Sequence, residues 1–296
     1  TFPLGLQKPR LEGRGSLLLK FYERRARRIL PALYVVMALC LPFAWLWLMP
    51  SDAKEFSNSA MAVLVFASNI FFWQSSDYFD AGSELKPLLH TWSLGVEEQF
   101  YVLFPIFLML AWRLGRKRIV VLLTIVALLS LALAVYEASR KPVATFFLLP
   151  TRGWELAMGS LVAFYLEGKE RDQFPLALKQ MLSLVGFGLI AVAALTFSKE
   201  TPFPGLYALV PTVGAGLIIV FGSPETFVGR LLASRVLVGV GLISYSAYLW
   251  HQPLLSFARH RSLTELGEMV IAGIIVLTFG LAYMTWRYVE TPFRRG

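Results

Sequence analysis

Two adjacent carboxylates, Glu97 and Glu98, stand in the segment HTWSLGVEEQFYVLFP, residues 90–105, which passes into an apolar stretch. Ionisable groups at bilayer depth are costly, so they mark a functional site by default. The polar residues that follow one stripe of the segment are His90, Trp92, Ser93, Glu97 and Tyr101. We expect this stripe to line a substrate-binding cavity, with one carboxylate paired to an arginine and the other orienting a base or hydroxyl. Alternatively, Ser93 caps the helix and the acids complement its dipole.

A cluster of arginines occupies FYERRARRILP, residues 21–31, at the start of another apolar stretch. One interpretation is a cytoplasmic anchor obeying the positive-inside rule. The other is a phosphate clamp, because Arg25 and Arg28 are three residues apart and share a helical face. Guanidinium groups suit phosphate oxygens. Together with Arg24, these two arginines are the candidate binding residues for a nucleotide-bearing donor.

Two further segments carry polar residues in apolar surroundings. In TRGWELAMGS, Arg152 and Glu155 are three residues apart, so we expect them to pair on one helical face. The pair has either a structural or a catalytic role. In ISYSAYLWHQPLL, Ser244, Tyr248 and His251 follow the spacing of one helical stripe, with Ser244 and Tyr248 as candidate substrate-binding residues. His251 is either a satisfied core residue or a site residue, and its polar neighbours favour a site. His260, in the basic stretch RHR, is expected to be solvated.

Several chemistries are absent from the sequence. It contains no GxSxG elbow, HExxH helix or P-loop. Three histidines and the single cysteine, Cys40, do not make a convincing metal site, so we expect none. The net charge of +9 is typical of the basic cytoplasmic loops of a membrane protein, and we expect no nucleic-acid partner.

The composition predicts an all-α, polytopic membrane protein, since 56% of the residues are hydrophobic and 16% are charged. A spanning helix needs about 20 mostly apolar residues. The apolar runs cover residues 29–49, 60–73, 100–112, 119–136, 154–166, 176–197, 206–221, 236–257 and 269–288. Basic clusters at 24–28 and 113–118 predict cytoplasmic ends, whereas the acidic loop 75–89, with Asp77, Asp80 and Glu84, predicts the outer face. Two apolar runs, 29–49 and 60–73, lie between the cytoplasmic cluster 24–28 and the outer loop 75–89, where only one full crossing fits. We therefore expect about eight full crossings in all, with 60–73 re-entrant or interfacial.

These residues alone are compatible with an enzyme and with a transporter or flippase that uses the polar interior as a path. The four segments, however, resemble the motifs of the acyltransferase-3 family in order: FYERRARRILP, TWSLGVEEQFY, RGWE and SYSAYLWHQP. The closing WRYVETPFRR is also similar to the family's common ending.

The resemblance implies a multi-pass O-acyltransferase of the bacterial inner membrane. It would move an acetyl or other short acyl group from cytoplasmic acyl-CoA, the donor substrate, to a hydroxyl of a cell-envelope or exported glycan. No bound cofactor is implied, and some members carry a periplasmic partner domain. Residues implied in catalysis are Glu97, Glu98, Arg152, Glu155 and His251. Arg24, Arg25 and Arg28 are implied in donor binding.

Family members usually begin with two further helices, the first of which carries a basic residue followed by a histidine. No residues before Arg24 can supply that helix. We therefore expect residues 1–296 to form a single acyltransferase-3-like membrane domain that lacks its N-terminal helices. It is either a fragment of a longer chain, which the absence of an initial methionine favours, or a degenerate member of the family.

Overall fold

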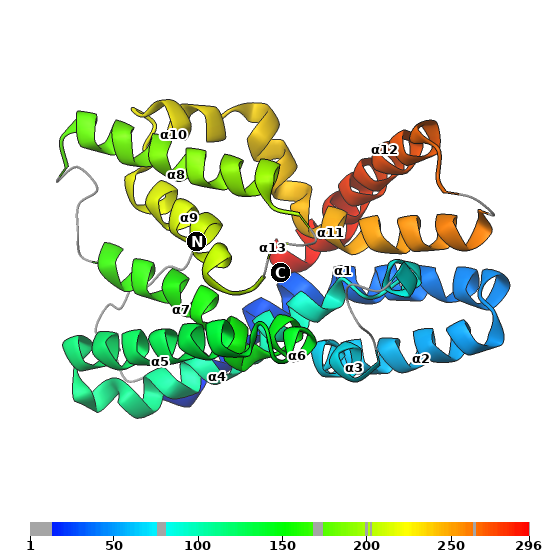
Figure 1. The fold of residues 1–296 in the computed structure, drawn as a ribbon, viewed down its shortest axis with the longest axis horizontal. Helices are drawn as coiled ribbons and strands as arrows, with labels where there is room; N and C mark the ends of the chain where they lie inside the picture. The colour runs from blue at the N-terminus through cyan, green and yellow to red at the C-terminus, as the bar shows by residue number, and fades with distance from the viewer. Residues whose placement is uncertain are drawn as a thin grey trace. The chain divides into compact units, whose positions relative to one another are not determined.

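A computed structural model describes residues 14–75, 81–167, 174–198, 201, 203–262 and 265–295, and over these residues helices are the only regular secondary structure (Figure 1). Asp77 and Asp80 of the predicted outer loop lie outside the described residues. The chain forms two compact units. Unit 1 comprises Thr1–Ser68, Asp80–Thr91 and Gly239–Gly296, and unit 2 comprises Asn69–Phe79 and Trp92–Val238.

Unit 1 contains both ends of the described chain. Its elements are α1 (Arg14–Trp47), α2 (Pro50–Leu64), η1 (Ala81–Leu85), most of α11 (Arg235–Arg261), α12 (Glu268–Thr285), the π-helical turn η5 (Trp286–Glu290) and α13 (Thr291–Arg295). Unit 2 contains the middle of the chain. Its elements are most of α3 (Ser68–Ser75) and α4 (Thr91–Ala111), then η2 (Trp112–Leu114), α5 (Arg116–Glu137), α6 (Pro142–Phe147), α7 (Leu149–Leu166), α8 (Leu176–Thr196), η4 (Leu206–Ala208), α9 (Leu209–Phe221) and α10 (Phe227–Leu232).

The helix α1 is longer than a bilayer requires. Its 34 residues rise about 1.5 Å each, which exceeds a hydrocarbon core of about 30 Å. It continues through Pro31 and Pro42. The arginines of the FYERRARRILP motif occupy its N-terminal part, so the apolar remainder can cross the membrane while they stay at one end.

Five helical stretches of the described residues are long and apolar enough to span a membrane. They are Leu18–Trp47, Thr91–Leu114, Arg116–Glu137, Leu176–Thr196 and Glu268–Arg294. The predicted count of eight crossings is therefore not confirmed. The other three predicted spans are α7 and α11, which carry the polar motifs, and α9, which has only 13 residues.

The apolar run 60–73 is not one continuous helix. It is divided between α2 and α3 at Val65–Ala67, where Phe66 has a φ of 54°, in the left-handed region. Because such a conformation interrupts helical hydrogen bonding, neither piece reaches spanning length. That this run is re-entrant or interfacial stays a prediction.

In unit 1, side chains of α11 tie it to its neighbours. The Tyr245 hydroxyl donates to the carbonyl oxygen of Ile29 in α1, at 2.9 Å. The buried hydroxyl of Ser246 donates to Glu290 Oε1 at 2.5 Å, and Arg294 pairs with Glu290 Oε2 at 2.8 Å. The Trp250 indole donates to Thr285 Oγ1 at 3.0 Å. These bonds fix the rotation of α11 about its axis, and hence the direction in which its polar stripe faces.

Candidate active site

The cluster with the clearest chemistry lies in unit 1 and joins two segments far apart in the sequence. The imidazole rings of His90 and His251 have centroids 5.3 Å apart, and the ring of Tyr248 lies 4.9 Å from that of His90. The Tyr248 hydroxyl donates to the carbonyl oxygen of His90 at 2.5 Å. The structure thus brings together three residues that the sequence analysis named in two separate motifs.

The hydrogen bond of His251 determines which of its ring nitrogens carries a proton. Its Nδ1 lies 2.6 Å from the carbonyl oxygen of Tyr248, one turn earlier in α11. A carbonyl oxygen only accepts, so Nδ1 is the donor in the neutral ring. The lone pair is then on Nε2, which gives His251 the tautomer that a general base needs.

His90 has a different character. Both of its ring nitrogens are buried. Burial, followed by the electrostatic effect of His251, lowers the pKa of His90 from 6.5 to about 3, although a hydrogen bond with the Pro87 backbone acts in the opposite direction. His90 is therefore neutral near pH 7, and it faces His251 as an uncharged ring.

Two other histidine and serine assignments need revision. Ser244 is exposed, and its hydroxyl bonds to the carbonyl oxygen of Gly241 in its own helix, so the structure does not bring it to the cluster. The interpretation of His260 as a solvated loop residue is wrong. It lies in the last turn of α11, where Nε2 bonds to the carbonyl oxygen of Leu85 at 2.9 Å and Nδ1 is 4.0 Å from Asp52.

In unit 2, the predicted pairing of Arg152 with Glu155 on α7 is confirmed, at 3.3 Å. The Arg152 guanidinium lies over three aromatic rings, at 5.3 Å from Trp92, 5.6 Å from Phe146 and 5.1 Å from Phe203. Such rings attract a cation through their π faces. Trp92 is therefore one of the aromatic rings that pack against Arg152. Its predicted contact with substrate stays a prediction.

The N-cap interpretation of Ser93 is wrong. The helix α4 begins at Thr91, so Ser93 lies within its first turn, and no acidic residue falls in that turn. Glu97 and Glu98 follow in the second turn; Glu98 is buried and Glu97 is half-buried, as are Ser93 and Tyr101. The division of the chain places His90 in unit 1 and the rest of the predicted stripe in unit 2.

The arginine cluster presents three exposed side chains. Arg24, Arg27 and Arg28 are exposed and Arg25 is half-buried, and Arg27 forms an ion pair with Glu23 at 2.7 Å. The Nε of Arg24 donates to the carbonyl oxygen of Lys20 at 3.2 Å. Arg24 and Arg28 can therefore be reached from outside the unit, as a donor-binding role requires.

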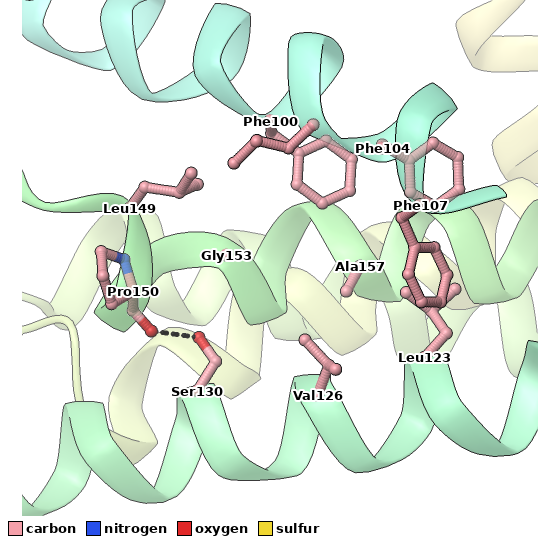
Figure 2. Close-up of a pocket in the computed structure, with 11 residues that line it drawn as sticks. Phe100, Phe104, Phe107, Leu123, Val126, Ser130, Leu149, Pro150, Gly153 and Ala157 are labelled. Carbon is pink, nitrogen blue, oxygen red and sulfur yellow. Dashed lines mark hydrogen bonds between the residues drawn. The ribbon is translucent and has the colours of Figure 1, made fainter. Parts of the chain in front are cut away.

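An apolar cavity of about 290 Å³ lies in unit 2 between α4, α5 and α7 (Figure 2). The residues lining it are Phe100, Leu103, Phe104, Phe107, Leu123, Val126, Ser130, Leu149, Pro150, Gly153 and Ala157. Its one polar side chain is already engaged, because the Ser130 hydroxyl donates to the carbonyl oxygen of Pro150 at 2.6 Å and accepts from the Trp154 amide. The cavity therefore suits an alkyl group and offers nothing to a charged one.

Sequence reasoning missed several polar residues of α11 that contact the segment leading to His90. They are Gln252, Ser256 and Arg259, and the revised His260 belongs with them. The signal was present, since Tyr248, Gln252, Ser256 and His260 repeat every four residues along one helix.

In the described part of the chain, whose regular secondary structure is helical, His251 thus lies beside a tyrosine and a buried histidine. The comparison with known families identifies the class of protein. The profile of the family described as "Acyltransferase domain" matches residues 12–287, and the chain belongs to this family.

Among curated proteins, the chain is similar to O-acetyltransferase OatA of Staphylococcus aureus, with 28% identity over 296 residues, covering 94% of this chain and 48% of that protein. It is also similar to peptidoglycan O-acetyltransferase OatA of Listeria monocytogenes, with 29% identity over 306 residues, covering 95% of this chain and 47% of that protein. The chain thus spans about half the length of these relatives. No solved structure matches it significantly.

Proposed function

We propose that the chain is the membrane domain of an O-acetyltransferase that moves an acetyl group from acyl-CoA to a hydroxyl of a cell-envelope glycan. The family membership and the printed names of the relatives support this reaction, and the Listeria monocytogenes relative makes peptidoglycan the first acceptor to test. A transporter or flippase, the alternative that the polar residues left open, gains no support from this membership.

The observation that carries the proposal is the tautomer of His251. Its Nε2 lone pair takes the proton of the acceptor hydroxyl as the oxygen bonds to the thioester carbonyl carbon. The carbon–sulfur bond then breaks, and the CoA thiolate leaves with the proton that the imidazolium returns. The acceptor gains the acetyl ester, so atoms and charge balance.

Arg24, Arg25 and Arg28 are proposed to hold the phosphates of acyl-CoA at the cytoplasmic end of α1. The positive-inside rule places this end in the cytoplasm. Phosphate binding by guanidinium forks needs side chains that can reach solvent, and the exposure of Arg24 and Arg28 supports this role. We propose no bound cofactor, because acyl-CoA is the donor substrate of the reaction.

Glu97, Glu98, Arg152 and Glu155 of unit 2 are proposed as further catalytic residues. The aromatic rings around Arg152 and the carboxylate of Glu155 fix the position of its guanidinium, an arrangement that suits stabilisation of negative charge. Glu97 and Glu98 are proposed to orient hydroxyl groups from the second turn of α4. The bacterial inner membrane is the proposed location, and a periplasmic domain is a proposed partner.

Label transfer tests the proposal. Membranes are prepared from cells that express the full-length protein containing this chain. They are given radiolabelled acetyl-CoA, and the alkali-labile label in peptidoglycan is counted. We expect Arg25→Ala and Arg28→Ala to raise KM for acetyl-CoA about tenfold, the loss of roughly one charge-assisted contact. Arg27→Ala is the matched control, because Arg27 pairs with Glu23 in the same turn. The proposal would be refuted if the glycan stayed unlabelled and the protein instead transported a solute across the membrane.

A further inference from the structure

The segment that leads to His90 is held by one stripe of α11. Five side chains of this helix contact backbone carbonyl oxygens between Glu84 and His90. They are Tyr248 to His90 at 2.5 Å, Gln252 to Lys86 at 3.2 Å, Ser256 to Leu85 at 2.6 Å, Arg259 to Glu84 at 3.4 Å and His260 to Leu85 at 2.9 Å.

The order of these contacts is systematic. From Tyr248 to Arg259 the donors advance along α11 while the accepting carbonyls move back from His90 to Glu84, so the segment runs antiparallel to the helix; His260 then contacts Leu85. Successive donors from Tyr248 to Arg259 are three or four residues apart, which is the spacing of one helical face. His260 directly follows Arg259. A single face of α11 therefore supplies side-chain partners for four carbonyls of this segment, of which that of Lys86 also accepts from the Leu89 amide.

Ion pairs anchor the far end of the segment. Arg259 pairs with Glu84 at 2.9 Å, and Lys86 pairs with Glu55 of α2 at 2.5 Å. His251 lies on α11 between Tyr248 and Gln252, two of the donors. The same helix thus carries the proposed base and fixes the backbone that presents His90 to it.

We propose that Gln252 and Ser256 are positioning residues that hold the segment 84–90 so that the His90 ring stays buried against His251. They touch neither substrate nor donor and act through His90. The consequence for catalysis rests on the proposed function, but the placement of His90 does not.

Chemical labelling of the histidines tests the placement without an activity assay. Membranes containing the full chain are treated with diethyl pyrocarbonate near pH 7, and modification of His90 is measured by mass spectrometry. We expect Ser256→Ala and Gln252→Leu to raise the rate about tenfold by freeing the segment, and Ser256→Thr, which keeps the hydroxyl, to protect His90. Thr278→Val is the control, since Thr278 bonds only within its own helix, to Ile274.

Kinetics with acetyl-CoA complete the test. Ser256→Ala should lower kcat about tenfold or more with KM unchanged, and Ser256→Thr should restore it, because misplacing a reacting group lowers the rate of the chemical step. Unchanged His90 protection in both Ser256→Ala and Gln252→Leu would overturn the proposal. If the parent chain transferred no acetyl group but His90 were still modified faster in Ser256→Ala and Gln252→Leu, the proposed function would be overturned. The positioning role of Gln252 and Ser256 would then still hold.

Discussion

At the scale of single residues, His90 links the candidate site to pH. Its pKa is lowered to about 3 in the folded chain, against 6.5 when exposed. Below about pH 6.5 the unfolded chain therefore binds more protons than the folded one, and stability falls as the pH drops. Above that pH the contribution is constant.

We expect the free energy of unfolding to fall by on the order of 3 kcal/mol between neutral pH and about pH 4 through this group. Thermal unfolding in detergent over this pH range measures the effect. His90→Phe keeps a ring beside Tyr248 without a titrating nitrogen, so its acid-dependent loss should be smaller. Equal pH slopes for the two chains would contradict the assignment.

The sequence predicted part of this site. Periodicity placed Tyr248 and His251 on one face of a helix, and the structure agrees because that face depends only on local geometry. The meeting of His90 with His251 could not be predicted, because it depends on how distant segments pack. Ser244 shares the periodicity but lies a turn beyond the segment 84–90, where it bonds within its own helix.

At the scale of elements, the crossing of α8 and α9 depends on two glycines. A Cβ at Gly186 would lie 2.7 Å from the carbonyl oxygen of Gly214, and a Cβ at Gly214 would lie 2.7 Å from that of Gly186. Small residues allow this close backbone approach between helices in a membrane. The contact is reciprocal, so neither position can accept a side chain unless the helices separate.

Gly186→Ala should therefore destabilise unit 2 by about 1–3 kcal/mol, the usual range for overpacking. Gly188→Ala in the same helix is the matched control, since its Cβ would meet nothing within 4 Å. That change should be neutral or stabilising by up to about 1 kcal/mol, because alanine is the better helix former. Thermal unfolding of the two variants measures the difference. Equal losses of stability in Gly186→Ala and Gly188→Ala would refute the close glycine contact between α8 and α9.

The boundaries of the long helices were predicted well and the short ones poorly. The runs 119–136 and 176–197 correspond to α5 and α8 within three residues, since a long apolar run determines a helix by itself. The break between α2 and α3 had no proline or glycine to announce it. It follows from the backbone of Phe66, which tertiary packing determines.

At the scale of the whole molecule, orientation in the membrane is the open prediction. The fold class was predictable because composition alone makes the chain a helical membrane protein. The number of crossings stays a prediction, because α7, α9 and α11, which the sequence counts as spans, are not among the five described stretches long and apolar enough to cross a membrane.

Cysteine labelling tests the orientation across α4. In a Cys40→Ala background, Gly82→Cys in the predicted outer loop should react in intact cells with a maleimide that cannot cross the membrane. Lys117→Cys, in the predicted cytoplasmic cluster, should react only after the cells are opened. Both positions are exposed in the structure. Reaction of both from outside would show that α4 does not cross the membrane.

We propose that His251 is the general base of the acetyl transfer. The most direct test is chemical rescue of the His251→Ala chain, assayed as labelled acetate transferred from acetyl-CoA to glycan in membranes. We predict a loss of about 10²–10⁴-fold in kcat, the usual contribution of a general base, and partial recovery when free imidazole is added. Thr278→Val should transfer at the parent rate. Full transfer by the His251→Ala chain without imidazole would contradict the account.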